Sequence, residues 1–299
     1  MDIIGHEHTR KLLGRIASGM LPHHAFLFSG PEGVGKSLVA REFAASLLGC
    51  PNGDPSLKQD FLLVVPHVRK NAKKGKNAKK GIFVEDVREV GLFLSRFPAE
   101  SKRRVVLIDD ADRMNENAQN ALLKTLEEPN TTSILILIVS RPGALRDTVV
   151  SRMFRVPFSL IPESVMSANM GVSIPEGKTP IAQFFYTLGR PGIIAGAVTD
   201  PEKFIERQDL LRPLFKLSAL SFSERIAHAE KLSVSPMETA DLFEWWTSGL
   251  RKRQPLDASV RETVLLYRRL EEIEKTTRLL RDTNANARLL IDRLFLVAF

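Results

Sequence analysis

The first 160 residues carry five short, continuously apolar runs, separated by longer stretches whose apolar residues recur at helical spacing. An unbroken apolar run of this length is typical of a strand covered on both faces, as in a parallel sheet between two layers of helices. Leu122, Leu123 and Leu126, for example, mark one face of a helix between two such runs. The pattern therefore predicts an α/β fold for residues 1–160. The expected strands are Ala25–Ser29, Phe61–Val65, Val105–Asp109, Ile134–Ser140 and Phe154–Phe158.

The pattern changes twice after this α/β region. Residues 161–200 are rich in proline and glycine, with short helical stretches between them, which indicates a small separate helical piece. Residues 201–299 carry no convincing strand, and Leu265, Leu270 and Ile273 recur there at helical spacing. We therefore expect three parts, with boundaries at 1–160, 161–200 and 201–299, the last of them all-helical.

Composition excludes several classes of protein. With 43% hydrophobic and 26% charged residues, the chain has enough apolar side chains to form cores, which excludes wholesale disorder. The longest apolar run, Ile134–Val139, is far shorter than the roughly 20 residues of a membrane-spanning helix. A single cysteine, Cys50, excludes an intrachain disulfide and a multi-cysteine zinc site. No basic-then-apolar leader opens the sequence, so a cytoplasmic location is expected.

The net charge of +8 is concentrated in one segment. Arg69–Lys80 carries seven basic residues and no acidic one, so the rest of the chain has a net charge of 8 − 7 = +1. The segment repeats one hexapeptide, Lys-Asn-Ala-Lys-Lys-Gly, at 70–75 and 76–81. Mutual repulsion and the lack of large apolar residues favour a mobile, solvated loop, and contact with DNA is the functional alternative.

A phosphate-binding motif follows the first expected strand. It matches G-x-x-x-x-G-K-[ST] at every fixed position and is followed by an amphipathic stretch from Leu38 to Leu48. In a strand–loop–helix setting, backbone N–H groups and the helix N-terminus wrap a polyphosphate. Lys36 is expected to reach the β- and γ-phosphates and Ser37 to bind Mg²⁺. The candidate nucleotide-binding residues of this phosphate loop are Gly30, Pro31, Glu32, Gly33, Val34, Gly35, Lys36 and Ser37.

Two carboxylates end the expected strand Val105–Asp109. A strand end beside a phosphate loop is where an aspartate that organises Mg²⁺ belongs, and Asp109 is the candidate. The next residue commonly activates the attacking water, and here it is Asp110 rather than the longer glutamate. Because catalysis is sensitive to displacements of about 1 Å, nucleotide binding is the stronger inference and hydrolysis the weaker.

With these motifs in hand, the sequence resembles the AAA+ clamp-loader subunits of bacterial DNA polymerase III. The most specific stretches are Asp109–Asn115 and Ala121–Pro129. The resemblance implies an AAA+ nucleotide-binding domain, a small helical lid and a helical collar that joins subunits. It further implies ATP and Mg²⁺ as ligands. The implied partners are gamma/tau-type and delta-type subunits and, through the complex, the sliding clamp and primed DNA.

The resemblance also assigns roles to residues outside the phosphate loop. Ser140 stands at the sensor 1 position, and Arg152 in Ser151-Arg152-Met153 stands where the family has an arginine finger that reaches a neighbour's ATP. The segment Gly189–Gly192 resembles the sensor 2 region, but Ile193 and Ile194 follow where hydrolysing relatives carry an arginine. Arg190 is the alternative sensor 2 residue, and an exposed arginine without such a role is the alternative for Arg152. The zinc module of many relatives cannot form with Cys50 alone, so no zinc is expected.

Three functions remain open at this point. The first is a ring subunit with weak or absent ATPase activity that supplies Arg152 in trans, with Asp110 and Arg152 as the candidate catalytic residues. The second is an actively hydrolysing gamma-type clamp-loader ATPase, against which Asp110 and the missing sensor 2 arginine count. The third is a P-loop small-molecule kinase, which no acceptor-binding motif supports.

Overall fold

The computed structural model of the chain describes residues 3–19, 23–50, 53–69, 80–170, 188–252, 259–283 and 285–299. It divides into two compact units. The first comprises Met1–Ser173 and Gly189–Ile193, and the second comprises Ile174–Leu188 and Ile194–Phe299. The expected boundaries of a nucleotide-binding domain, a lid and a collar remain a prediction.

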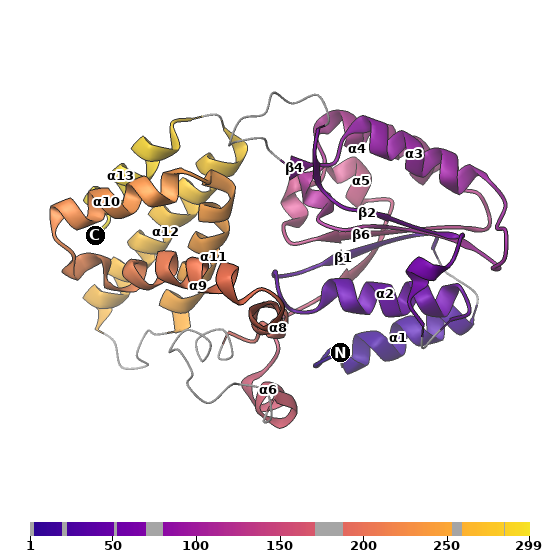
Figure 1. Ribbon diagram of the computed structural model, residues 1–299, viewed down its shortest axis with the longest axis horizontal. Coiled ribbons are helices and arrows are strands. Elements are labelled where there is room, and N and C mark those ends of the chain that lie inside the picture. The colour runs from indigo at the N-terminus through magenta and orange to yellow at the C-terminus, as the bar shows by residue number, and fades with distance from the viewer. Residues whose placement is uncertain are drawn as a thin grey trace. The chain divides into compact units, whose positions relative to one another are not determined.

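A five-stranded parallel sheet forms the centre of the first unit (Figure 1), with the strand order β2-β5-β6-β1-β7. All five expected strands are present, and each begins and ends within one residue of the predicted bounds. The continuous apolar runs thus belong to strands that are covered on both faces. Their bounds are β1 (Ala25–Ser29), β2 (Phe61–Val64), β5 (Arg104–Ile108), β6 (Ser133–Val139) and β7 (Phe154–Pro157).

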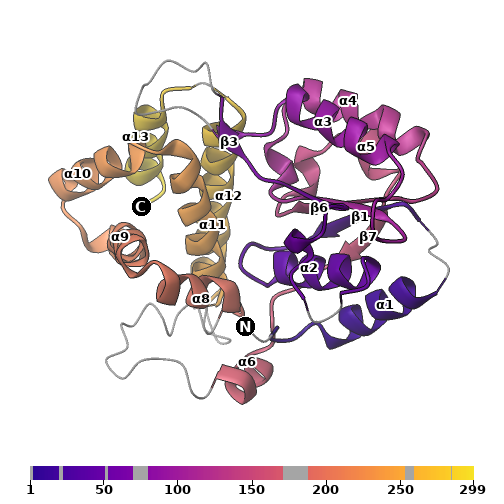
Figure 2. The same cartoon turned by 45° about the vertical axis from the view of Figure 1, so that its right-hand side comes forward.

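Helices cover both faces of this sheet, as Figures 1 and 2 show. The shorter elements of the unit are η1 (Pro55–Leu57), η2 (Ala111–Arg113), η3 (Pro142–Ala144) and α6 (Glu163–Met170). One face packs against α1 (Glu7–Ser18) and α2 (Lys36–Leu47). The other face packs against α3 (Val84–Ser95), α4 (Glu116–Glu127) and α5 (Asp147–Val150).

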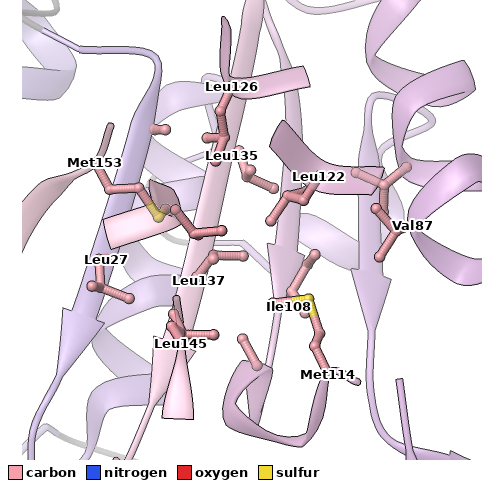
Figure 3. Close-up of a cluster of buried hydrophobic side chains, with 14 of the residues drawn as sticks. Leu27, Val87, Ile108, Met114, Leu122, Leu126, Leu135, Leu137, Leu145 and Met153 are labelled. Atoms are coloured by element: carbon pink, nitrogen blue, oxygen red, sulfur yellow. The ribbon is translucent and has the colours of Figure 1, made fainter. Parts of the chain in front are cut away.

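Alternate residues of β1 pack against the two helical layers. Phe26 and Phe28 point toward α2, where the ring of Phe26 meets that of Phe43 edge to face at 5.1 Å between centroids. Leu27 lies in the opposite cluster with Leu122 of α4 (Figure 3). Full burial of such side chains stabilises the fold by about 1.5–3 kcal/mol each, so the two layers hold the strand ends in fixed positions.

A two-stranded hairpin that the sequence pattern did not predict flanks the basic segment. β3 (His67–Val68) and β4 (Lys80–Gly81) pair antiparallel, with His67 opposite Gly81. At the start of the basic segment, Arg69 donates a hydrogen bond to Glu85 over 2.8 Å. The interpretation of the segment as a mobile loop falls on residues 70–79, which lie outside the described residues.

The second unit is helical throughout its described residues. Ser221 and Ser259 cap the helices that follow them and form capping boxes with Glu224 and Glu262, which satisfies N–H groups at those helix starts. α8 begins in the first unit at Pro191. The elements are α8 (Pro191–Thr199), α9 (Pro201–Leu211), η4 (Arg212–Ala219), α10 (Phe222–Ser233), α11 (Pro236–Lys252), α12 (Val260–Asp282) and α13 (Ala287–Val297).

Aromatic side chains and one arginine hold these helices together. Trp246, Phe243 and Phe295 are fully buried and lie within ring contact of one another through Phe243. Arg281 of α12 donates to Asp241 of α11 over 2.7 Å and also to Glu244. Within the described part of the chain, no helix is long and apolar enough to cross a membrane.

A buried carboxylate directly before β2 accepts hydrogen bonds from the segment that leads into β5. Asp60 is fully buried and accepts hydrogen bonds from the backbone N–H groups of Ala99, Glu100 and Ser101 over 2.7–2.8 Å. Arg104 adds a charge at 3.5 Å. Burial raises the pKa of the Asp60 carboxyl, but the N–H donors and Arg104 outweigh burial, so the pKa lies below its usual value.

We expect Asp60→Asn to destabilise the first unit by about 2–4 kcal/mol at pH 7, because three backbone N–H groups and Arg104 lose a buried charged acceptor. A depressed pKa stabilises the fold above the unfolded-state pKa of about 4, and this stabilisation is lost as the pH falls through the folded-state value. The difference between wild type and variant should therefore shrink below about pH 4.

Urea unfolding followed by far-UV circular dichroism measures this difference. The fluorescence of Trp245 and Trp246 reports on the second unit and serves as an internal reference, since these are the only tryptophans of the sequence. Glu89→Gln on the exposed face of α3 is the matched control. Equal unfolding midpoints for Asp60→Asn and wild type at pH 7 would contradict the assignment.

Candidate functional site

The candidate site lies at the carboxyl edge of the sheet, where three neighbouring strands end. β5, β6 and β1 are adjacent, and Ser29 of β1 pairs with Val139 of β6. After β1 the chain continues to the far edge strand β2, and it places its last strand, β7, on the other side of β1. Ligands of open parallel sheets bind where the strand order reverses in this way. The topology therefore brings the residues after β1, β5 and β6 to one place.

The phosphate loop, Gly30–Ser37, connects β1 to α2 in a conformation that requires glycine. A Cβ on Gly30 would lie 2.2 Å from the carbonyl oxygen of Phe158, so a side chain cannot fit there. Gly35, the residue before α2, has a φ of +101°, which L side chains rarely adopt. The loop thus leads directly into a helix N-terminus, whose N–H groups and dipole favour an anion.

The ammonium group of Lys36 lies inside the phosphate loop. It donates to the carbonyl oxygens of Gly30 and Pro31, both over 2.7 Å, and to the hydroxyl of Ser140 over 3.2 Å. Burial lowers the pKa of Lys36 to about 8, although four nearby carboxylates, led by that of Glu32, act to raise it. Lys36 and Ser140 were both predicted as site residues, and the structure brings them together.

The two predicted magnesium ligands are also adjacent. Ser37 donates a hydrogen bond to Asp109 over 2.8 Å, and the other carboxylate oxygen of Asp109 accepts the N–H of Asp110 over 3.0 Å. Mg²⁺ binds hard oxygen ligands and commonly uses one or two protein groups together with substrate phosphates. A hydroxyl and a carboxylate beside the phosphate loop therefore fit that ion.

Asp110, the predicted water-activating residue, has an unusual backbone and an electrostatic partner. Its φ is +48°, in the left-handed region, at the start of η2. Its carboxylate lies 3.6 Å from the guanidinium of Arg113. The ion pair with Arg113 engages this carboxylate, so the arrangement does not favour proton abstraction from water.

One ion pair near the site was missed from the sequence. Arg141, directly after Ser140, donates to the largely buried carboxylate of Asp112 over 3.0 Å. The pair links the segment after β6 to the segment after β5. The only sequence signal was a third aspartate in Asp109–Asp112, which alone does not identify a partner.

Arg152 makes its contacts away from the phosphate loop. Its guanidinium donates to the carbonyl oxygen of Thr148 and to the carboxylate of Glu127, both over 2.8 Å. Its side chain is 38% exposed, so it is at the surface of the first unit. The structure therefore does not place Arg152 among the residues around Lys36.

Arg190 contacts the phosphate loop, but through the backbone. Its guanidinium donates to the carbonyl oxygen of Glu32 over 2.6 Å. On the other side, the ring of His6 lies 3.0 Å from the carbonyl oxygen of Val34 and packs edge to face on Phe158. Burial lowers the pKa of His6, which keeps the ring neutral at pH 7. The sequence indicated the Gly189–Gly192 segment as a sensor 2 region, but it predicted neither of these bonds.

Comparison with known proteins identifies the family of this chain. A family model described as "DNA polymerase III, delta subunit" matches residues 5–162. The DNA polymerase III subunit delta' of Pseudomonas aeruginosa is 29% identical over 262 residues, covering 77% of this chain and 72% of the relative. The subunit tau/gamma of Haemophilus influenzae is 29% identical over 189 residues, and this match covers 60% of this chain but only 26% of that protein.

A solved structure shows the same fold over nearly the whole chain. The gamma subunit-related protein of DNA polymerase III from Thermotoga maritima matches with a TM-score of 0.52 and 19% identity, over 97% of this chain and 98% of that one. The family model spans more than half of this sequence and includes the phosphate loop, Asp109, Ser140 and Arg152. The chain therefore belongs to the DNA polymerase III delta subunit family, as a clamp-loader subunit similar to delta'.

Proposed function

We propose that this protein binds Mg-ATP at the phosphate loop, turns it over slowly or not at all on its own, and supplies Arg152 to the ATP of a neighbouring clamp-loader subunit. The main support for the proposal is that the phosphate loop is complete and that its lysine and serine contact the polar residues after β5 and β6. Lys36 is only 5% exposed and lies beside Ser140, and Ser37 meets Asp109. These are the groups that a magnesium–triphosphate complex needs.

Slow turnover is supported by two features of the site. The carboxylate of Asp110 is close to Arg113, and Arg190 donates to the loop backbone at Glu32. Neither arrangement favours activation of water or recognition of a transferred phosphoryl group. The similarity to gamma/tau subunits over 60% of this chain favours the second candidate, an actively hydrolysing ATPase.

The proposed partners are gamma/tau-type and delta-type subunits, with the sliding clamp and primed DNA reached through the complex in the cytoplasm. Arg152 supports contact with a neighbour because it is an exposed arginine whose planar fork matches phosphate oxygens. In the isolated chain, Glu127 and Thr148 hold this fork at the surface. We propose that it engages the ATP of the adjoining subunit once the ring forms.

The helices after residue 200 are proposed as the collar that joins the ring. α12 carries an exposed apolar stripe at helical spacing, formed by Val260, Val264 and Tyr267. Val260 is 82% exposed and Tyr267 is 64% exposed. Such a stripe on one helix face is suited to pack against a helix of another subunit.

Lys36→Ala should abolish Mg-ATP binding, and the wild-type chain alone should hydrolyse ATP well below about 1 s⁻¹, the lower end of common enzyme rates. Because the Lys36 pKa is about 8, the ammonium is lost as the pH rises through that value. ATP affinity should therefore fall about tenfold between pH 7.5 and pH 9. Isothermal titration and a phosphate-release assay measure both quantities. Turnover of about 1 s⁻¹ or faster by the isolated chain would favour the gamma-type alternative.

Arg152→Ala should leave this chain's own ATP affinity unchanged while slowing ATP hydrolysis by the assembled complex. Arginine fingers contribute about 10³–10⁵-fold at a single site, and the bulk effect is smaller in a ring with several sites. Arg152→Lys should not restore the rate fully, since a point charge cannot reproduce the bidentate fork. Arg155→Ala, an exposed position on β7, is the control. Wild-type hydrolysis and clamp loading by Arg152→Ala complexes would refute the role in trans.

The double variant Val264→Glu, Tyr267→Glu should fold normally but fail to co-purify with gamma/tau-type and delta-type subunits. Two buried carboxylates at a helix–helix contact are strongly unfavourable, whereas both positions are exposed in the isolated chain. Thermal unfolding by circular dichroism checks the fold, and gel filtration of mixed subunits measures assembly. Arg261→Glu, one residue beyond the start of the stripe, is the charge control. Normal assembly of the double variant would exclude this stripe from the interface.

A further inference from the structure

The segment Gly189–Ile193 packs directly on the phosphate loop, although it lies more than 150 residues away in the sequence. The N–H of Gly192 donates to the carbonyl oxygen of Gly33 over 2.7 Å. The guanidinium of Arg190 donates to the preceding carbonyl, that of Glu32, over 2.6 Å. This one segment thus donates hydrogen bonds to two consecutive carbonyls of the phosphate loop.

The position of this segment at the start of α8 explains why its backbone can donate a hydrogen bond to the phosphate loop. The first N–H groups of a helix have no acceptor within the helix, and Pro191 at the first position has no N–H to satisfy. The next N–H, that of Gly192, therefore uses Gly33 as its acceptor. The positive end of the helix dipole faces a carbonyl oxygen in this arrangement, which is favourable.

Two glycines allow the segment and the loop to approach so closely. A Cβ on Gly192 would lie 2.9 Å from the carbonyl oxygen of Gly33, which is backbone and cannot swing away. A Cβ on Gly33 would lie 2.6 Å from the side chain of Ile193. Behind the segment, a Cβ on Gly189 would lie 2.1 Å from the carbonyl oxygen of Ile161. The segment is therefore fixed from both sides.

Arg190 is enclosed in this contact. Arg190 is only 4% exposed, and its guanidinium donates to the carbonyl oxygen of Glu32 in the loop. A hydrogen bond from a charged donor to a carbonyl is stronger than a neutral one, and a group held in this way is pre-organised before any ligand arrives.

We propose that Gly189–Ile193 is a latch that holds the phosphate loop in one conformation without nucleotide, with Arg190 as its positioning residue. Because Arg190 is held by the loop backbone, it adds nothing to the recognition of a third phosphate by Lys36 and Ser140, and the site binds nucleoside diphosphates and triphosphates with affinities that differ little. This second statement rests on the proposed nucleotide binding, whereas the latch itself does not. Nucleotide occupancy of the site would then be similar before and after hydrolysis of the third phosphate.

The test compares variants of the full chain by two independent measurements. Arg190→Met removes the donor but keeps the packing of the side-chain stem, Arg190→Lys restores a charged donor, and Gly192→Ala separates the segment from the loop. The matched controls are Arg155→Met on β7 and Gly14→Ala, whose Cβ would meet nothing within 4 Å. Hydrogen exchange of residues 30–37 is measured without nucleotide, and dissociation constants are measured for Mg-ATP and Mg-ADP.

Wild type should bind the two nucleotides with affinities within about fivefold of each other, since no more than about 1 kcal/mol separates them in this arrangement. Arg190→Met and Gly192→Ala should speed exchange in the loop and weaken both nucleotides by the same factor of about ten, and Arg190→Lys should recover part of each effect. The controls should match wild type.

Several outcomes would overturn the proposal. Unchanged exchange of residues 30–37 in both Arg190→Met and Gly192→Ala would exclude the latch. Loss of ATP affinity alone in Arg190→Met would show that this arginine reads the third phosphate. If wild type bound neither nucleotide, the proposed function and the similar-affinity statement would fall together, and the exchange measurement would still decide whether the latch exists.

Discussion

A buried ammonium group sets the arrangement of the candidate site. The ammonium group of Lys36 lies inside the phosphate loop, where it donates hydrogen bonds to two loop carbonyls and to the hydroxyl of Ser140. A buried charge is costly unless it is compensated, and four nearby carboxylates act on this one group: that of Glu32 in the phosphate loop and three that follow β5. The register of β1 with β6 places Ser140 within reach. The strand order, the phosphate loop and the acidic segment after β5 together compensate the buried charge of Lys36.

At this edge of the sheet, the residues proposed to bind nucleotide lie close together, whereas the residues proposed to act in hydrolysis have other partners. The proposed ligands of phosphate and magnesium lie close together: Ser37 donates a hydrogen bond to Asp109, and Lys36 donates one to Ser140. The groups that would drive a reaction are engaged elsewhere: Asp110 lies close to Arg113, and Arg152 is bonded to Glu127. This division is physically consistent with a family whose members work as parts of a larger assembly.

The sequence predicted the elements that leave a strong local pattern. The five sheet strands are continuous apolar runs, and the structure contains all of them. The phosphate loop and Asp109 were predicted as site residues from motif spacing, and the structure brings Ser37 and Asp109 together. The hairpin of β3 and β4 was missed because each strand has only two residues, largely exposed, which leave no apolar run. The bond from Arg190 to Glu32 could not be predicted, because it depends on where α8 begins relative to a loop 158 residues away. Local chemistry is readable from the sequence, but long-range register is not.

The unpredicted hairpin has a consequence for how this protein can vary in length. Paired strands lie about 4.8 Å apart, so the chain re-enters β4 next to the point where it left β3. Residues added between the two strands leave the ends of the sheet in place. The free energy of closing a loop rises only with the logarithm of its length, about 0.6 kcal/mol per doubling. An insertion of six residues between β3 and β4 therefore costs little free energy of loop closure. The same geometry makes the connection a suitable insertion point for an epitope or a fluorescent label.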